Sequence, residues 1–160
     1  MPRITPNLWF DTEAEEAAEF YVSIFPNSRI LERVPNSGGT PAPDVEFITI
    51  VFELDGQKLV AINGGPHFKF TEAISLEIEC ESQEQVDYYW SRLTEGGEEG
   101  PCGWLKDRYG LSWQVVPIRL EELLADPDPE RARRATEAMF TMRKIDIAAV
   151  EAAADGVGAA

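Results

Sequence analysis

The feature that most constrains the fold is an internal repeat. Residues 4–10 and 73–80 each alternate apolar with polar side chains, as a strand does, and a helical pattern follows both. Thr12 and Ser82 open these helices, each with a Glu or Gln three residues further on, which is a capping-box pattern. The two copies lie about 70 residues apart, and repetition at such a period indicates one supersecondary unit built twice.

Further strands follow each helix. In the first copy the helix stops at Pro26, and strands are predicted over residues 28–34, 45–54 and 58–63. Asp55-Gly56 stands between the last two, and this dipeptide is a strong hairpin signal, so these strands should be antiparallel neighbours. The first copy therefore has the order β, α, β, β, β.

The second copy resembles the first but is shorter. Its helix stops at Gly96-Gly97, and two short strands are predicted at 103–106 and 111–116. The segment 107–110 between them is interpreted as a hairpin turn, and we assign it no chemistry. The acidic run 95–99 is interpreted as a solvated face or loop.

The chain past Pro117 has a helical composition. Asp128-Pro129 supplies a cap and a first-turn proline for the longest of the expected helices. The predicted helices cover residues 120–125, 129–142 and 146–154.

These elements predict an α+β fold. Because the strands of each copy follow one another through short turns, a doubly wound parallel sheet does not fit. We expect two βαβββ modules that form a curved mixed sheet, with the helices outside and a concave inner face where a ligand would sit. Residues 1–118 would form this domain, with halves of about 1–68 and 69–118, and residues 119–160 its C-terminal helical extension.

Charge and hydropathy narrow the possible partners. The 160 residues include 29 acidic and 14 basic side chains, a formal net charge of -15. Such a charge repels phosphates, so nucleic acid and anionic membrane surfaces are not expected partners. No segment approaches the length of a membrane span, and no apolar signal core follows Met1, so we expect a cytoplasmic protein.

Two cysteines, Cys80 and Cys102, do not make a disulfide framework. In a reducing compartment they are expected to be free thiols. The alternative for Cys102 is a thiol nucleophile.

Four stretches of the chain carry a family resemblance. They are residues 4–11 (ITPNLWFD), 18–21 (AEFY), 63–66 (NGGP) and 102–114 (CGWLKDRYGLSWQ). With them the chain resembles the PhnB-like branch of the vicinal oxygen chelate superfamily, which includes glyoxalases, bleomycin-resistance proteins and extradiol dioxygenases. Members of this branch are often labelled 3-demethylubiquinone-9 3-methyltransferase, and the resemblance implies a homodimer. In that dimer, extra contact could come from the tail residues Ala132, Ala135, Met139 and Met142.

The resemblance also locates the superfamily's metal-ligand positions. Matched by strand ends, these fall at Thr5, Ala61, Ala73 and Gln114, which offer no imidazole or carboxylate. A shift of one residue adds only Glu72 as a donor, and a tight site needs about three such ligands. We therefore expect no metal. The methyltransferase label implies S-adenosylmethionine, but no Gly-rich turn joins the first strand to its helix, so no cofactor is expected.

Strand alternation predicts what lines the concave face. If the four positions above point inward, so do Leu59, Ser112 and several polar or aromatic side chains. Core or interface packing is the alternative for Trp9 and Trp104. The candidate ligand-binding residues are Asn7, Trp9, Asn63, Ser75, Trp104 and Gln114.

Two residues are candidate general bases. His67 follows the end of an inward strand, and a histidine side chain is a common general base, although a surface loop histidine is the plainer interpretation. Glu77 would point inward, although an exposed strand glutamate is the plainer interpretation in so acidic a chain.

Two functions remain open. We favour a binding module that holds a small hydrophobic or aromatic compound without metal or catalysis. The alternative is a metal-independent enzyme acting on a quinone-like or carbonyl substrate, with His67 or Glu77 moving a proton.

Overall fold

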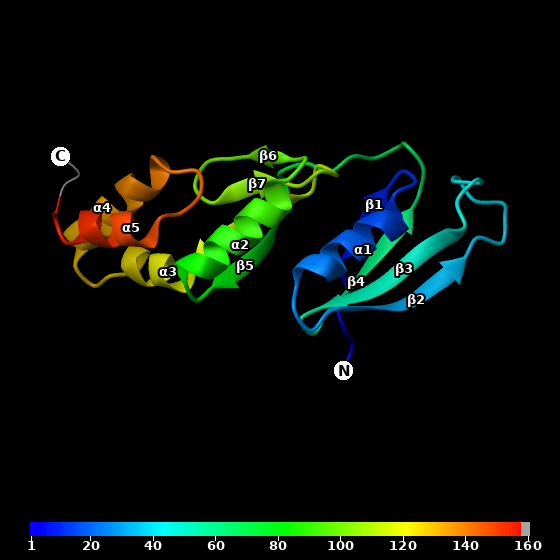
Figure 1. The fold of residues 1–160 in the computed structure, drawn as a ribbon, viewed down its shortest axis with the longest axis horizontal. Coiled ribbons are helices and arrows are strands. Elements are labelled where there is room, and N and C mark those ends of the chain that lie inside the picture. The colour runs from blue at the N-terminus through cyan, green and yellow to red at the C-terminus, as the bar shows by residue number, and fades with distance from the viewer. Residues whose placement is uncertain (158–160) are drawn as a thin grey trace. The chain divides into compact units, whose positions relative to one another are not determined.

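The computed structural model describes residues 1–157 and divides the chain into two compact units. The first unit covers residues 1–70, and the second begins at Thr71. Within the described residues each unit opens with the order β, α, β, β, β, and three more helices end the second unit (Figure 1). The α+β fold class with two βαβββ modules is confirmed.

The first unit holds a four-stranded mixed sheet of order β1-β4-β3-β2. β1 and β4 are parallel, and the other pairs are antiparallel. The predicted hairpin joins β3 to β4 through Asp55 and Gly56, both at positive φ. β2 pairs with β3 through a register that shifts twice. The elements are β1 (Asn7–Phe10), α1 (Ala14–Ile24), β2 (Arg29–Pro35), β3 (Phe47–Leu54) and β4 (Gln57–Asn63).

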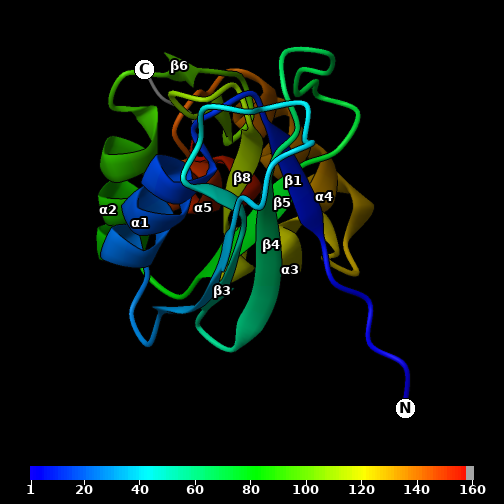
Figure 2. The same cartoon turned by 90° about the vertical axis from the view of Figure 1, so that its right-hand side faces the viewer.

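The core of this unit lies between α1 and one face of the sheet, as Figure 2 shows. The helix presents an apolar stripe, in which three alanines allow close approach and Tyr21 stacks on Phe52 at 6.2 Å between ring centroids. The sheet contributes Leu8, Phe10, Ile50, Phe52, Leu59 and Ala61, all buried.

The predicted capping box at the start of α1 is wrong. Thr12 does not cap the helix, because the helix begins at Ala14, whose backbone N–H donates to Asn63 Oδ1 at 2.9 Å. The Asn63 amide nitrogen in turn donates to the carbonyl of Phe47 at 2.9 Å. A residue from the end of β4 has therefore taken the place of the local cap.

The second unit repeats the topology, with sheet order β5-β8-β7-β6 and parallel β5 and β8. Ser82 caps α2 as predicted, because its hydroxyl accepts from the Gln85 N–H at 3.2 Å. The elements are β5 (Leu76–Cys80), α2 (Gln83–Thr94), β6 (Glu98–Glu99), β7 (Trp104–Lys106) and β8 (Ser112–Pro117).

Strand β6 refines the interpretation of residues 95–99 as a solvated face or loop: Glu98 and Glu99 are exposed, as expected, and form a two-residue strand. Glu98 pairs with Lys106 across the ladder, and glycines flank the short strand. A Cβ at Gly97 would lie 2.1 Å from the Lys106 carbonyl, so this close pairing requires glycine there. A run of acidic residues is typical of a loop, so the sequence did not reveal this two-residue strand. The flanking glycines make its close pairing possible.

Three helices complete the second unit, as predicted within a few residues at their ends. They are α3 (Ile118–Leu124), α4 (Pro129–Phe140) and α5 (Ile147–Ala154), with Asp128 and Asp146 as side-chain caps. They share an apolar cluster with the end of β8. Its buried members are Val116, Leu120, Leu123, Ala135, Ile145, Val150 and Ala154.

The tail residues expected to add dimer contact are largely used within the chain. Ala135 is fully buried in that cluster, and Met139 and Met142 pack against it. The homodimer itself stays a prediction. None of the helices in residues 1–157 has the length and apolar character needed to cross a membrane.

Candidate ligand pocket

The sheet of the second unit has two different faces. Trp113 pairs with Leu76 and with Leu105, and this set is apolar. Gln114 pairs with Glu77 and with Trp104, so the alternate set is polar and aromatic. The Gln114 amide also donates to Ser75 Oγ at 2.9 Å. The prediction that Ser75, Glu77 and Gln114 share a face is confirmed.

The corresponding prediction for the first unit is wrong by one residue in β4. Asn63 pairs with Phe10, and Trp9 pairs with Ile62, so Asn63 and Trp9 lie on opposite faces. Ala61, paired with Leu8, is buried on the side of α1. Because side chains alternate along a strand, the slip of one position in the matching exchanged the two faces of β4.

Trp9 packs on the loop that follows β4. Its indole N–H donates to the Gly65 carbonyl at 2.9 Å, and Phe68 meets its ring edge to face at 4.9 Å. A Cβ on Gly64 would fall 2.3 Å from the ring, so the absence of a side chain there admits the indole. His67 is exposed in the same loop. Ligand stacking on Trp9 and a base role for His67 stay predictions.

Asn7 and Asn63 differ in exposure and partners. Asn7 is exposed, and its amide donates to the Thr5 carbonyl at 3.0 Å. Asn63 is 2% exposed, and both polar atoms of its amide take part in the hydrogen bonds to α1 and β3 described above. A ligand role for either residue stays untested.

The second unit contains a cavity of about 550 Å³, a size that suits a small organic ligand. It is lined by the polar face of β7 and β8, the turn between β6 and β7, and one residue of α4. Trp104 was a predicted ligand residue and does lie in this wall. The lining residues are Glu72, Glu98, Glu99, Gly100, Pro101, Cys102, Trp104, Leu105, Lys106, Ser112 and Phe140.

Ser112 is a buried polar group of this wall that has no hydrogen-bond partner within residues 1–157. The residue is 1% exposed, and its hydroxyl makes no hydrogen bond to any described residue. A buried hydroxyl left unpaired costs about 1–3 kcal/mol. Because Ser112 borders the cavity, a small displacement of the wall would expose its hydroxyl to a ligand atom that accepts or donates a hydrogen bond. The sequence placed Ser112 on this face but gave no sign of the missing partner.

The charged groups of the wall are mostly acidic. Lys106 Nζ pairs with Glu72, and this hydrogen bond raises the pKa of Lys106 and lowers that of Glu72. Glu99 accepts a hydrogen bond from the indole N–H of Trp90 at 2.8 Å. With three carboxylates against one ammonium, the lining disfavours an anionic ligand.

The two cysteines are both free, as predicted, and have different surroundings. Cys102 is half-buried in the cavity wall, with its backbone at a φ of 56°. Cys80 is fully buried at the end of β5, and burial raises the pKa of its thiol to about 11.

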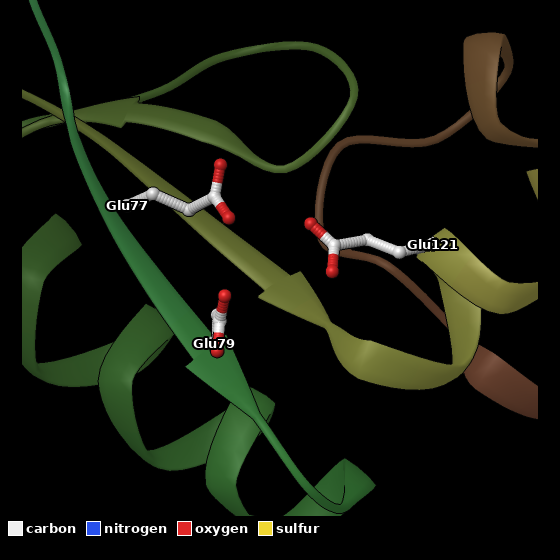
Figure 3. Close-up of side chains that lie close together, drawn as sticks. All are labelled: Glu77, Glu79 and Glu121. Carbon is white, nitrogen blue, oxygen red and sulfur yellow. The ribbon is translucent and has the colours of Figure 1, made fainter.

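Three carboxylates gather beside the pocket face, as Figure 3 shows. Glu77 and Glu79 project from β5 and Glu121 from α3, with oxygen atoms within 4.8 Å of one another. All three are exposed. Desolvation and the charge of Glu121 raise the pKa of Glu77. The predicted proton-transfer residue therefore sits in an acidic group that the sequence did not reveal, because Glu121 comes from the tail.

The positions matched to the superfamily's metal ligands do not fit a divalent ion. Ala61 is buried against α1, and its neighbours Val60 and Ile62 on the opposite face of β4 carry no donor atom. Ala73 carries none either. The Gln114 amide nitrogen is directed to Ser75. A glyoxalase-type ion needs carboxylate or imidazole donors at these positions, and they carry neither.

Comparison with known proteins places this architecture among related folds. Residues 2–116 match the family described as 3-demethylubiquinone-9 3-methyltransferase. A Bacillus cereus structure described by the same activity, as a PhnB protein, is 32% identical, with a TM-score of 0.66 over 73% of this chain and 100% of that one. No curated protein matches the sequence.

Two more distant structures share the fold. Protein PA1353 from Pseudomonas aeruginosa is 19% identical, with a TM-score of 0.63 over 73% of this chain and 98% of that one. The fosfomycin resistance protein FosX from Listeria monocytogenes is 17% identical, with a TM-score of 0.54 over 76% of this chain and 97% of that one.

Proposed function

Because this chain belongs to the PhnB-like family described as 3-demethylubiquinone-9 3-methyltransferase, with a fold of the glyoxalase and bleomycin-resistance type, we propose that it binds a small aromatic molecule in the cavity of its second unit. Binding needs neither a metal nor a cofactor. Trp104 and Phe140 supply apolar area, and Ser112 supplies one hydrogen bond.

The unpaired Ser112 hydroxyl is the observation that carries this proposal. Its desolvation is already complete in the free protein, so a ligand that pairs with it gains a hydrogen bond without further burial of that group. The acidic lining favours a neutral or cationic ligand over an anion. The ligand class is therefore a neutral or cationic aromatic molecule with one hydrogen-bonding substituent.

A set of naphthalene derivatives tests this proposal. Naphthol carries the substituent, naphthalene lacks it, and naphthoate adds a negative charge. We expect naphthol to bind most tightly, because it carries a hydrogen-bonding group without a negative charge. Calorimetry measures the Kd of each compound. A thermal shift reports binding as well, since a ligand at 100 times its Kd adds about 2.7 kcal/mol of stability. Failure of all three compounds to bind, or a preference for naphthoate, contradicts the proposal.

Ser112→Ala separates the hydroxyl from the rest of the wall. The variant should bind naphthol about tenfold more weakly and naphthalene with unchanged affinity. Ser91→Ala is the matched control, because Ser91 is an exposed helix residue whose hydroxyl bonds to the Tyr88 carbonyl. Equal loss for naphthol and naphthalene would indicate a general disturbance of the wall.

A second candidate function rests on Glu77. Its raised pKa suits a general base, so a metal-independent enzyme acting on a carbonyl or quinone-like substrate remains the alternative. Methyl transfer from S-adenosylmethionine has less support, since the connections before α1 and α2 contain no glycine. Turnover lost in Glu77→Gln or His67→Ala with binding intact would favour the enzyme.

A further inference from the structure

The pocket wall includes a residue from outside the family's own fold. The family match ends at residue 116, and α3, α4 and α5 lie beyond it. Phe140, the last residue of α4, nonetheless lines the cavity together with Trp104. Phe140 is 68% exposed, so its ring is open to contact with a ligand.

The segment after Phe140 is fastened to the turn that forms the cavity wall. The Cys102 N–H donates to the Met142 carbonyl at 2.8 Å, and the Gly103 N–H donates to the Arg143 carbonyl at 2.7 Å. Gly103 has a φ of 82°, and a Cβ there would lie 2.9 Å from the Val115 carbonyl. The tail therefore meets the cavity wall through paired backbone at a point where only glycine fits.

Contacts with α2 hold the same segment from the other side. The Gln83 amide donates to the Ile145 carbonyl at 3.0 Å and accepts from the Ile147 N–H at 2.9 Å. Lys144 forms an ion pair with Asp87 at 2.9 Å. Ile145, in the same segment, is fully buried in the apolar cluster of the tail. Phe140 is thus carried on a rigid part of the unit, as a residue that shapes a binding site must be.

We propose that the C-terminal extension is a specificity element, and that Phe140 sets the size of aromatic ligand the cavity accepts. This inference rests on the proposed binding function. The part of the chain that matches the family supplies Ser112 and Trp104, and the extension supplies Phe140. A smaller residue at 140 enlarges the cavity, and a larger one narrows it.

The experiment uses the full chain and three neutral probes of increasing size: phenol, naphthol and hydroxyanthracene. Wild type should prefer naphthol. Phe140→Ala should weaken naphthol binding about five- to tenfold and move the preference toward hydroxyanthracene, since an aromatic contact contributes about 0.5–1.5 kcal/mol beyond burial. Phe140→Trp should move the preference toward phenol.

Tyr88→Ala is the control, because Tyr88 is 40% exposed on α2 and lies outside the cavity lining. Thermal unfolding of both Phe140 variants should match wild type, which separates ligand selection from stability. If both variants rank the probes as wild type does, the specificity role of Phe140 is wrong and the binding function stands. If wild type binds none of the probes, the binding function itself is wrong.

Discussion

The carboxylate of Asp107 accepts a hydrogen bond from the indole N–H of Trp113 at 2.9 Å, and both residues are almost fully buried. The other carboxylate oxygen accepts from the backbone N–H groups of Tyr109 and Leu111, at 2.8 and 3.1 Å. The turn over residues 107–110 is thus confirmed, and its aspartate stabilises the β7–β8 connection.

Asp107→Ala should destabilise the protein by about 3–5 kcal/mol, because it removes the shared acceptor of the Trp113, Tyr109 and Leu111 N–H groups from a largely buried turn. Urea denaturation of the full chain measures this. Asp44→Ala, at an exposed loop aspartate, is the control and should change stability by less than about 0.5 kcal/mol. Similar values for the two variants would contradict a structural role for Asp107.

The unusual cap of α1 gives a second prediction. Asn63→Ala removes the bonds to Ala14 and Phe47 and should cost about 2–3 kcal/mol. Thr12→Ala should cost less than about 0.5 kcal/mol, since Thr12 does not cap the helix. Chemical denaturation measures the stability loss of each variant. A larger loss for Thr12→Ala than for Asn63→Ala would mean that Thr12 caps the helix after all.

The acidic group predicts a pH effect with a defined sign. Because the pKa of Glu77 is raised in the folded state, the free energy of unfolding falls as pH rises through that pKa. The lost stability returns as pH falls and the carboxylate is protonated. Glu121→Gln should lower the pKa of Glu77 in a carbon NMR titration, and should raise stability at neutral pH by roughly 0.3 kcal/mol after screening.

Glu122→Gln is the matched control for that titration. Glu122 lies on the same helix but pairs with Arg119 at 3.1 Å, away from the three carboxylates. Its substitution should leave the pKa of Glu77 in place. A pKa of Glu77 that is insensitive to Glu121 would mean that burial and the charge of Glu79 raise it without Glu121.

The two thiols should react at very different rates. Cys102 is half-buried in the cavity wall, whereas Cys80 is fully buried with a pKa of about 11. An aromatic disulfide reagent should label Cys102 in the native protein and Cys80 only after unfolding. Counting labelled thiols in Cys80→Ala and Cys102→Ala checks this, and naphthol should slow the labelling of Cys102.

Local patterns predicted most of the secondary structure. The repeat, the Asp55-Gly56 hairpin and the Ser82 cap depend on neighbours in sequence, so the chain alone reveals them. The cap by Asn63 depends on a residue far from the helix in sequence. The strand β6 consists of two glutamates, whose charge is typical of a loop. These are the elements that sequence reasoning missed.

The candidate site was predicted only in part. Alternation located Gln114, Ser75 and Glu77 on one face, and Trp104 in the pocket wall. Alternation failed in β4, where one slipped position exchanged the faces. Phe140 could not be found, because its place in the wall depends on how the tail folds back along the turn at residues 102 and 103.

The short strand β6 and the shifted register of β2 both disfavour pairing of a sheet edge with another chain. Both are outer strands of their sheets, where unpaired backbone groups invite pairing with another chain. β2 is seven residues long but carries Arg29, Glu32 and Arg33 and an irregular register, whereas β6 offers only two residues. The two copies of one module thus resist edge-to-edge aggregation by different means, charge and irregularity in one and brevity in the other.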